Sequence, residues 1–391
     1  MEFSNKNPKS EVDITEMVHQ IFHEGIEIGA SDIHIEPTRK GFIVRYRVDG
    51  VLKVEFEGDK SLYGFVLSKI KILADLEITG KPRPQEGNIK FRMGERSVDL
   101  RISIFPTSLG EVVVARVLES NKHFGDYEDL GFNDDQITAL KSIIRKPHGL
   151  ILVTGPNGSG KSTTLFTILS KLNVPEKSLV TLEDPVERKI DMVRQTNIDP
   201  EIGLTFADGL RYLLRQDPDV LMVGEIRDKE TARIAVQAAI TGHLVLATIH
   251  TNNAAGAIVR LINMGIEPFL LSSAIKFISA QRLARLNCEF CKQEYNPPAE
   301  LIKALNAPSG IKFYHSVGCD KCFDKGTGGR EGVHEVLTIT RPVQELILQR
   351  PTDEHINNLA IKEGMQTLRQ AALQKVFQGK ISIEEALRLT E

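Results

Sequence analysis

The segment with the clearest chemical signature is GPNGSGKST, residues 155–163. It fits the pattern G-x-x-x-x-G-K-[S/T], with a strand pattern before it and a helix pattern after it, which counts against a chance glycine-rich turn. The glycines let backbone N–H groups turn toward a phosphate, and the helix N-terminus adds a favourable dipole. We expect Lys161 to neutralise the β- and γ-phosphate oxygens and Ser162 to bind Mg²⁺. The predicted phosphate-binding residues are Gly155, Pro156, Asn157, Gly158, Ser159, Gly160, Lys161, Ser162 and Thr163.

Hydrolysis of a bound nucleotide also needs one acid near Mg²⁺ and one that handles the attacking water. The segments TLEDPVE and LMVGEIRD each place acids at the end of a predicted parallel strand. Ligands of such sheets bind beyond the carboxyl ends of the strands, so we expect Glu183, Asp184 and Glu225 to converge on one phosphate. For each acid taken alone, helix capping or pairing with a cation is an equal alternative, and Asp228 is assigned to helix capping.

A further predicted strand, in GHLVLATIHTN, ends at His250 and Thr251. These residues are expected in the same crevice, where they could sense the γ-phosphate. His243 begins that strand and is therefore expected at the opposite rim, in a structural role.

All four cysteines of the chain fall in two C-x-x-C pairs, in NCEFC and GCDKC. Four thiolates in two close pairs suit tetrahedral Zn²⁺ with no open position, which predicts a structural rather than a catalytic metal. Reduced, zinc-free cysteines are the alternative. The predicted zinc ligands are Cys288, Cys291, Cys319 and Cys322.

The elements that must position these residues fall into separate regions. Residues 1–120 alternate apolar and polar positions around a hairpin signal at Asp49-Gly50, which predicts a small α+β domain. Residues 121–136 are polar and are predicted to be a linker. From Gly149 apolar strands alternate with helices, so residues 137–391 are predicted to form an α/β domain with a mostly parallel sheet. That domain is expected to include the cysteine module, 286–325, and C-terminal helices, 340–391.

Composition bounds the function. A length of 391 residues predicts two to three domains, and 41% apolar with 26% charged residues is typical of a globular protein. The net charge of −3 supplies no general attraction to nucleic acid. No apolar run is long enough to span a bilayer, and the polar N-terminus indicates no export, so a cytoplasmic protein is expected.

Taken together, the motifs GPNGSGKST, TLEDPVE, LMVGEIRD and TGHLVLATIHTN resemble, in this order, the Walker A, Asp box, Walker B and His box of one family. This is the family of type II secretion and type IV pilus assembly ATPases (GspE/PilB type). GASDIHIEP, RYRVDG and VDLRISIFPTSLGE are similar to its N2 domain, and QRLARLNCEFC to its C-terminal part. The resemblance runs from about residue 11 to the end.

The resemblance implies a RecA-like P-loop ATPase core preceded by a PAS-like N2 domain. It implies that Glu183 positions or deprotonates the attacking water and that Glu225 is the Walker B acid near Mg²⁺. It also implies that Arg101 and Arg116 of the N2 domain are brought over the nucleotide, although solvated strand arginines are the alternative. Further basic positions near the site, expected mainly at subunit contacts, are Arg211, Arg215 and Arg227.

The same resemblance implies a homohexamer that uses ATP, Mg²⁺ and Zn²⁺. Its expected partners are an inner-membrane platform protein and membrane-anchored assembly components, which would hold it at the cytoplasmic side of that membrane. The cysteine module is a mark of assembly and secretion motors rather than retraction motors. Asn157 stands where the family commonly has Thr. By the same resemblance, the N2 domain is expected to start close to the first residue, without the N-terminal membrane-partner module of many members. A nucleic-acid motor and a non-hydrolysing ATP-binding scaffold remain as alternatives.

Overall fold

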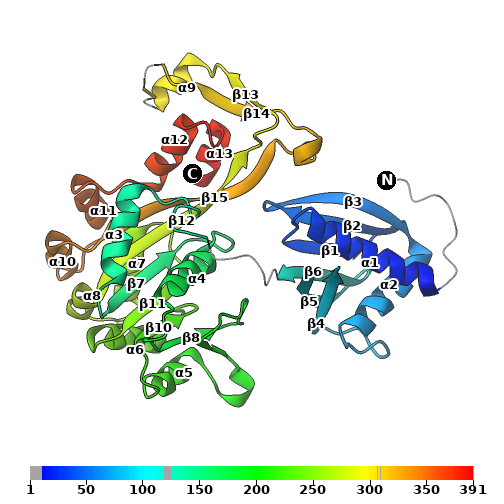
Figure 1. The fold of residues 1–391 in the computed structure, drawn as a ribbon, viewed down its shortest axis with the longest axis horizontal. Coiled ribbons are helices and arrows are strands. Elements are labelled where there is room, and N and C mark those ends of the chain that lie inside the picture. The colour runs from blue at the N-terminus through cyan, green and yellow to red at the C-terminus, as the bar shows by residue number, and fades with distance from the viewer. Residues whose placement is uncertain (1–10, 95, 119–124, 306, 309, 391) are drawn as a thin grey trace. The chain divides into compact units, whose positions relative to one another are not determined.

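The computed structural model describes residues 11–94, 96–118, 125–305, 307–308 and 310–390. The chain divides into two compact units, Met1–Lys122 and His123–Glu391 (Figure 1). Each unit has its own hydrophobic core.

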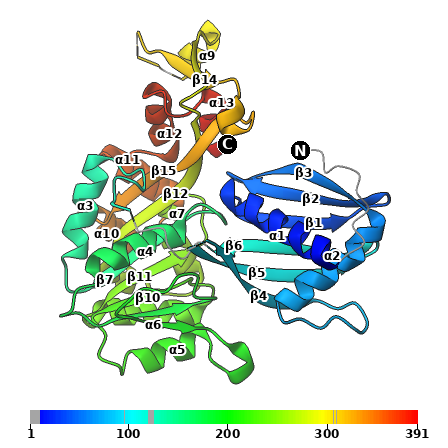
Figure 2. The ribbon, with the colours of Figure 1, turned by 45° about the vertical axis from the view of Figure 1, so that its right-hand side comes forward.

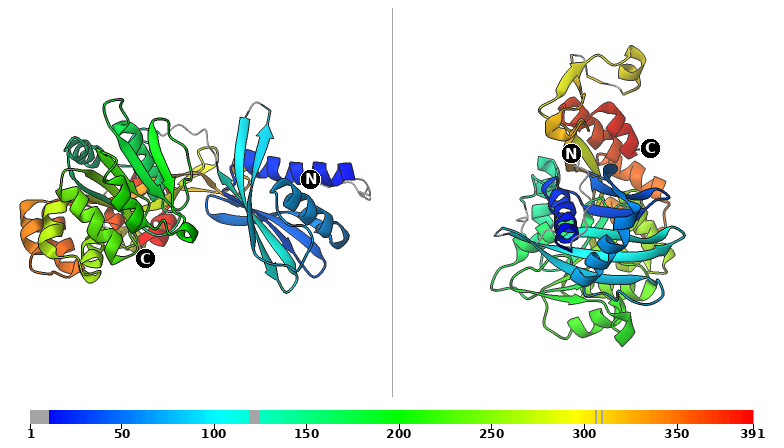
Figure 3. Two further views of the ribbon diagram at one scale, coloured as in Figure 1. Left: turned by 90° about the horizontal axis from the view of Figure 1, so that it is seen from below. Right: turned by 90° about the vertical axis from the view of Figure 1, so that its right-hand side faces the viewer.

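The first unit is a six-stranded antiparallel sheet with two helices on one face (Figure 3). The strand order is β3-β2-β1-β6-β5-β4. Its elements are α1 (Glu11–Glu27), β1 (Asp32–Pro37), β2 (Gly41–Val48), β3 (Val51–Asp59), α2 (Lys60–Leu73), β4 (Gln85–Met93), β5 (Arg96–Thr107) and β6 (Gly110–Leu118).

Alternation along the strands decides which face of this sheet is buried. In β5 the side chains of Leu100, Ile102 and Ile104 are fully buried against the helices, while Arg101 lies on the opposite face. The predicted hairpin is confirmed: Val48 pairs with Val51, and Asp49 and Gly50 have φ of 51° and 83°. Two consecutive positive φ values are the requirement of a type I′ turn, which explains the Asp-Gly pair.

The second unit contains a seven-stranded sheet in the order β15-β12-β7-β11-β10-β8-β9 (Figures 1 and 2). All neighbours are parallel except β12 and β15. The strands are β7 (Gly149–Thr154), β8 (Leu179–Glu183), β9 (Val193–Asn197), β10 (Val220–Val223), β11 (Leu244–Ile249), β12 (Ile275–Asn287) and β15 (Thr327–Thr338).

Helices cover both faces of this sheet, because the parallel strands are apolar on both sides. The helices α3 and α4 share a core with residues such as Ile151 and Leu246. The helices α6 to α8 and α10 to α13 share a second core with neighbours such as Leu150 and Val245. The helices are α3 (Asp134–Ile144), α4 (Lys161–Leu172), α5 (Phe206–Leu213), α6 (Lys229–Ile240), α7 (Ala254–Asn263), α8 (Pro268–Ala274), α9 (Ala299–Ala304), α10 (Arg341–Ile347), α11 (Asp353–Lys362), α12 (Leu368–Phe377) and α13 (Ile383–Thr390), with short 3₁₀ helices η1 (Pro200–Ile202) and η2 (Asp320–Cys322).

The α/β fold with a parallel sheet, cysteine group and C-terminal helices is thus confirmed. The seven-stranded sheet also contains strands that the sequence patterns did not identify, namely β9, β12 and β15. Part of the range predicted as linker is packed: Tyr127 and Phe132 are buried, and α3 begins at Asp134. Residues 119–124 of that segment lie outside the described residues.

Asp228 is the N-cap of α6. Its carboxylate accepts hydrogen bonds from the backbone N–H and the hydroxyl of Thr231 at 2.9 and 2.8 Å. This is the structural role that its position predicted. Among the described helices, none combines the length and the apolar character that crossing a bilayer requires.

Candidate functional site: the phosphate loop, the strand-end acids and the cysteine cluster

The loop between β7 and α4 has backbone conformations that require glycine. Gly155, Gly158 and Gly160 have φ of 146°, 73° and 86°. A Cβ on Gly155 would lie 2.4 Å from the Gln281 carbonyl oxygen and 2.7 Å from the Ser159 hydroxyl. No side chain therefore fits at the start of the loop.

The same loop is built to hold an anion. Gly160 caps α4 without a side-chain hydrogen bond, so no side-chain acceptor competes there for the N–H groups of the first turn. Ser159 has a buried hydroxyl with no partner among the described residues. Pro156, Asn157, Gly158, Ser162 and Thr163 are exposed, which leaves the mouth of the loop open to a ligand. These features fit the phosphates of a nucleotide.

Lys161 lies across this loop. Its ammonium donates to the carbonyl oxygens of Gly155 at 2.9 Å and Pro156 at 3.0 Å. Burial lowers the pKa of the Lys161 ammonium; Glu225 opposes this shift and Arg282 adds to it.

Glu225 follows β10 and lies in a chain of charged groups. One of its oxygens pairs with Arg227, and the other lies 3.5 Å from Nε2 of His250. Arg227 also reaches the Asp184 carboxylate at 3.5 Å. Arg227 thus lies between Asp184 and Glu225, and His250 lies against the other oxygen of Glu225, although these residues come from different strand ends.

Glu183 has a different environment from Glu225. It ends β8 with only 3% of its surface exposed. One carboxylate oxygen accepts hydrogen bonds from the Thr181 hydroxyl at 2.5 Å and from the Gln195 amide at 3.0 Å. Burial raises the pKa of Glu183, while these two hydrogen bonds oppose the rise. A Cβ on Gly224 would lie 3.4 Å from the Cα of Glu183, so the two predicted catalytic acids occupy neighbouring strand ends.

The loop after β11 is fastened to the strand before the phosphate loop. The backbone N–H of Thr251 donates to the Thr154 hydroxyl at 2.8 Å, and the two hydroxyls lie 2.8 Å apart. This holds His250 beside the site. His243, at the other end of β11, has its Nδ1 3.1 Å from the Ala238 carbonyl oxygen, away from these strand ends.

Arg101 and Arg116 belong to the first unit, where they are directly opposite each other on β5 and β6. Arg101 binds Glu86 at 2.7 Å, and Arg116 binds Asp32 at 3.1 Å. Their side chains are 38% and 62% exposed, on the face away from the core. Their contribution to a nucleotide site stays a prediction.

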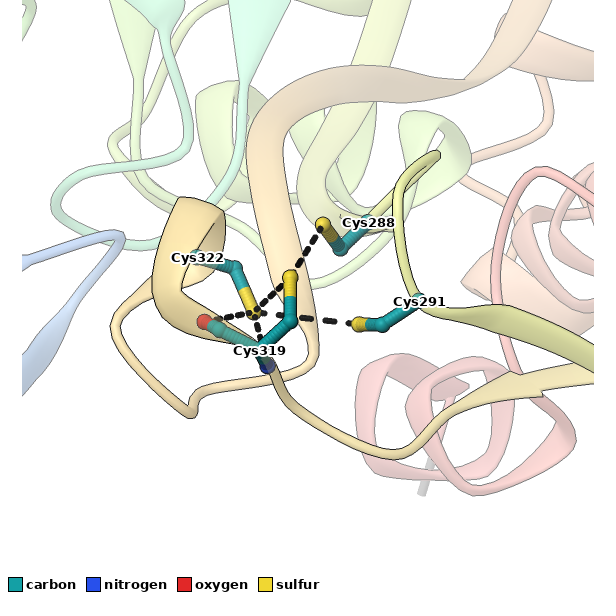
Figure 4. A group of neighbouring side chains, drawn as sticks. All are labelled: Cys288, Cys291, Cys319 and Cys322. Atoms are coloured by element: carbon teal, nitrogen blue, oxygen red, sulfur yellow. Dashed lines mark hydrogen bonds between the residues drawn. The ribbon is translucent and has the colours of Figure 1, made fainter.

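The four cysteines form one cluster in which the sulfur atoms all lie within 4.8 Å of one another (Figure 4). The separations Cys288–Cys319, Cys291–Cys322 and Cys319–Cys322 are 4.0, 3.8 and 3.8 Å. A tetrahedral zinc ion with Zn–S bonds of about 2.3 Å requires sulfurs about 3.8 Å apart. The cluster is therefore compatible with zinc.

Local backbone structure assembles this cluster. The strands β13 (Lys292–Tyr295) and β14 (Phe313–Ser316) form a small antiparallel sheet in which Lys292 is opposite Ser316. This register brings the segment after Cys288 and Cys291 beside the segment before Cys319.

The thiol of Cys322 is prepared to ionise. Its sulfur accepts hydrogen bonds from the backbone N–H groups of Cys319 and Gly326, both at 3.2 Å. Burial raises the pKa of this thiol, but these two N–H groups together with hydrogen bonds from the thiols of Cys319 and Cys291 lower it to about 7. Burial raises the pKa of the Cys291 thiol to about 12. Since metals bind thiolates, one thiol of the cluster is already close to the required form at neutral pH.

The chain is similar to known proteins over nearly its whole length. The family described as "Type II/IV secretion system protein" matches residues 7–388. The chain belongs to this family. It is an ATP-hydrolysing enzyme of the secretion and pilus ATPase type.

Two relatives illustrate the range of the family. The chain is 45% identical over 380 residues to the type II secretion system ATPase E of Vibrio cholerae, which covers 97% of this chain and 75% of that protein. It is 44% identical over 377 residues to the type IV pilus assembly ATPase PilB of Thermus thermophilus. The matched region covers 95% of this chain and 42% of that protein.

Solved structures give the same fold. The structure of the pilus retraction motor PilT with bound ADP has a TM-score of 0.64 and 27% identity, and covers 95% of this chain and 96% of that one. The ATPase DotB of Legionella pneumophila has a TM-score of 0.71 at 19% identity, and covers 99% of this chain and 98% of that one. The likeness to DotB shows the fold alone.

Some residues of the site were missed from the sequence because β12 was not recognised as a strand. Gln281 contacts both sides of the phosphate loop, and Arg282 donates to the Asn252 carbonyl oxygen at 2.9 Å. The apolar run in IKFISA, continuing into alternating residues, was the available signal. Arg227, which is expected near the site, lies between Glu225 and Asp184.

Proposed function

We propose that this chain is the hexameric motor that powers assembly of a type IV pilus or of a type II secretion pseudopilus. The observation that supports its hydrolytic site is geometric: the glycine-rich loop follows β7, and the acids Asp184 and Glu225, both paired with Arg227, follow the parallel strands β8 and β10 of the same sheet. The work it does is proposed from the similarity to the secretion ATPase of Vibrio and the pilus assembly ATPase of Thermus.

In this proposal the loop of residues 155–163 holds the phosphates of ATP, and Lys161 offsets their charge. The Ser162 hydroxyl and the Glu225 carboxylate would hold Mg²⁺, because hard oxygen donors suit this ion. Bound Mg²⁺ would supply neutralisation of charge on the β- and γ-phosphates. Asp184 and His250 would line the same site, Asp184 by its pair with Arg227 and His250 by its contact with Glu225.

Glu183 would accept a proton from the attacking water as its oxygen bonds to the γ-phosphorus and the bond to the ADP oxygen breaks. A base with a raised pKa is better matched to this transfer near neutral pH than an ordinary carboxylate. Arg101 and Arg116 are proposed to supply further positive charge to the transferring phosphoryl group.

Zn²⁺ held by the four cysteines would be structural, because the donor set is closed. The proposed partners are an inner-membrane platform protein and membrane-anchored assembly components, with the motor on the cytoplasmic side. A covalent crosslinking experiment in cells, followed by identification of the membrane protein that co-purifies, tests which machine it serves.

The catalytic assignment is tested by ATP hydrolysis with Lys161→Ala and Glu183→Gln, each expected to lower kcat by about 100-fold or more. Lys171→Ala is the matched control, because Lys171 lies at the other end of α4 and pairs with Asp126 at the surface. Wild-type rates in both variants would show that the assignment is wrong. Stimulation by single-stranded DNA that falls with salt would instead favour the nucleic-acid motor.

A further inference from the structure

Gln281 is a buried amide that touches both sides of the phosphate loop. Only 1% of its surface is exposed. Its Nε2 donates to the Ser159 carbonyl oxygen at 2.6 Å, and its Oε1 accepts from the Thr164 hydroxyl at 3.0 Å. The donor end of one side chain thus holds the loop while the acceptor end holds the first turn of α4.

The contacts of Gln281 extend over the whole loop. Its backbone oxygen is 2.4 Å from the position of a Cβ on Gly155, and its Nε2 is 3.2 Å from that of a Cβ on Gly160. The register of β12 on β7, in which Ala280 is opposite Thr154, places Gln281 beside the point where the strand becomes the loop. Gln281 therefore lies against the loop at Gly155, Ser159 and Gly160.

We propose that Gln281 is a positioning residue that holds the phosphate loop in its anion-binding shape before a nucleotide arrives. It would not touch the nucleotide itself. Its amide would fix the Ser159 carbonyl oxygen by a direct hydrogen bond and tie the loop to the first turn of α4. Without this contact, part of the ordering of the loop would have to occur on binding, which weakens the affinity for phosphates. The inference rests on the proposed nucleotide site.

A merely structural amide would stabilise the fold and leave the nucleotide affinity unchanged. The chain offers a matched control for this distinction in Asn287, another buried amide on β12. Its Nδ2 donates to the Gly379 carbonyl oxygen at 3.2 Å, and its exposed fraction is 5%. Replacement by leucine removes a buried amide from the same strand in both cases, but only Gln281 contacts the loop.

The experiment titrates the full chain with a fluorescent ADP derivative and measures ATP hydrolysis for Gln281→Leu and Asn287→Leu. We expect Gln281→Leu to raise the Kd for ADP and the KM for ATP by about 10-fold, the size expected for loss of one buried hydrogen-bonded group, with kcat changed by less than about 3-fold. Asn287→Leu should lower the melting temperature and leave the Kd for ADP within about 2-fold.

Thr164→Val is a second variant, nearly isosteric and therefore less disturbing to the fold. It removes the hydroxyl that donates to Gln281. We expect it to raise the Kd for ADP by about 3-fold, and the double variant with Gln281→Leu to be no weaker than Gln281→Leu alone, because both remove the same contact. Wild-type affinity in either single variant, or equal weakening by Asn287→Leu, would overturn the proposal. Lys161→Ala serves as the separate check, since unchanged ADP binding there would overturn the nucleotide site itself.

Discussion

The phosphate site and the cysteine cluster of the second unit are assembled in different ways. The cluster takes four identical ligands from two short segments that a small two-stranded sheet brings together. The phosphate site takes a loop after β7, acids after β8 and β10, a histidine after β11 and an amide from β12. The first needs one local contact between segments, whereas the second needs the correct order of strands in a sheet.

The difference also concerns charge. In the cluster, the surroundings raise the pKa of the Cys291 thiol and lower that of the Cys322 thiol. A cation is needed to hold the thiolates together. In the phosphate site, the chain supplies its own compensation, since Glu225 pairs with Arg227 and Glu183 accepts two neutral hydrogen bonds. We therefore expect substitutions in the cluster to act on stability and those at the strand ends to act on turnover.

The largest effect is expected in the cluster. Cys288→Ser should reduce bound zinc from about one ion per chain to near zero, and should cost several kcal/mol of local stability, since a structural zinc contributes on the order of 10 kcal/mol to a small module. Metal analysis and limited proteolysis of the segment 286–325 measure this. Glu289→Gln is the control, because Glu289 lies between the ligands of the same turn with an exposed side chain. Full zinc content in Cys288→Ser would contradict the ligand assignment.

The next effect separates the two acids. Glu225→Gln should raise the Mg²⁺ concentration needed for half-maximal turnover and lower kcat. Glu183→Gln should retain nucleotide and Mg²⁺ binding and lower kcat by about 100- to 1,000-fold. Titration of Mg²⁺ at saturating ATP distinguishes them. Asp228→Asn keeps a capping acceptor for α6 and should leave kcat within about 2-fold. If Glu183→Gln alone changed the Mg²⁺ requirement, the two roles would have to be exchanged.

The smallest effect concerns the pH dependence of turnover. The pKa of Glu183 is raised by burial and held back by the Thr181 hydroxyl, so Thr181→Val should raise this pKa further. Because the base must be ionised to accept a proton, activity is lost as the pH falls through the pKa, and the acid limb of kcat should move to higher pH. A shift of less than about one pH unit is expected from the loss of one hydrogen bond.

The control for this measurement is Thr167→Val on α4, whose buried hydroxyl has no partner among the described residues. Its pH profile should superimpose on that of the wild-type protein. An acid limb that is unchanged in Thr181→Val would show that Glu183 is not the group that limits turnover at low pH.

These two sites also show how far the sequence alone reaches. The cysteine pairs and the glycine-rich loop were predictable because their chemistry requires fixed residue types at short spacing. The strand ends at Glu183, Glu225 and His250 were predictable because apolar strands alternate with helices and such sheets place ligands at one edge. The Asp49-Gly50 hairpin and the cap at Asp228 were predictable because a tight turn and a helix start each favour particular residue types.

Contacts between segments that are distant in the chain were decided only by the tertiary structure. The pairing of β12 with β7, in which Ala280 lies opposite Thr154, places Gln281 against the phosphate loop. Likewise, the pairing of β9 with β8 brings Gln195 to Glu183. Amides leave no short-range pattern in a sequence, because their role is set by the partner that the sheet order supplies. The sequence by itself determined which chemistry is present, and the order of strands decided which buried side chains hold that chemistry in place.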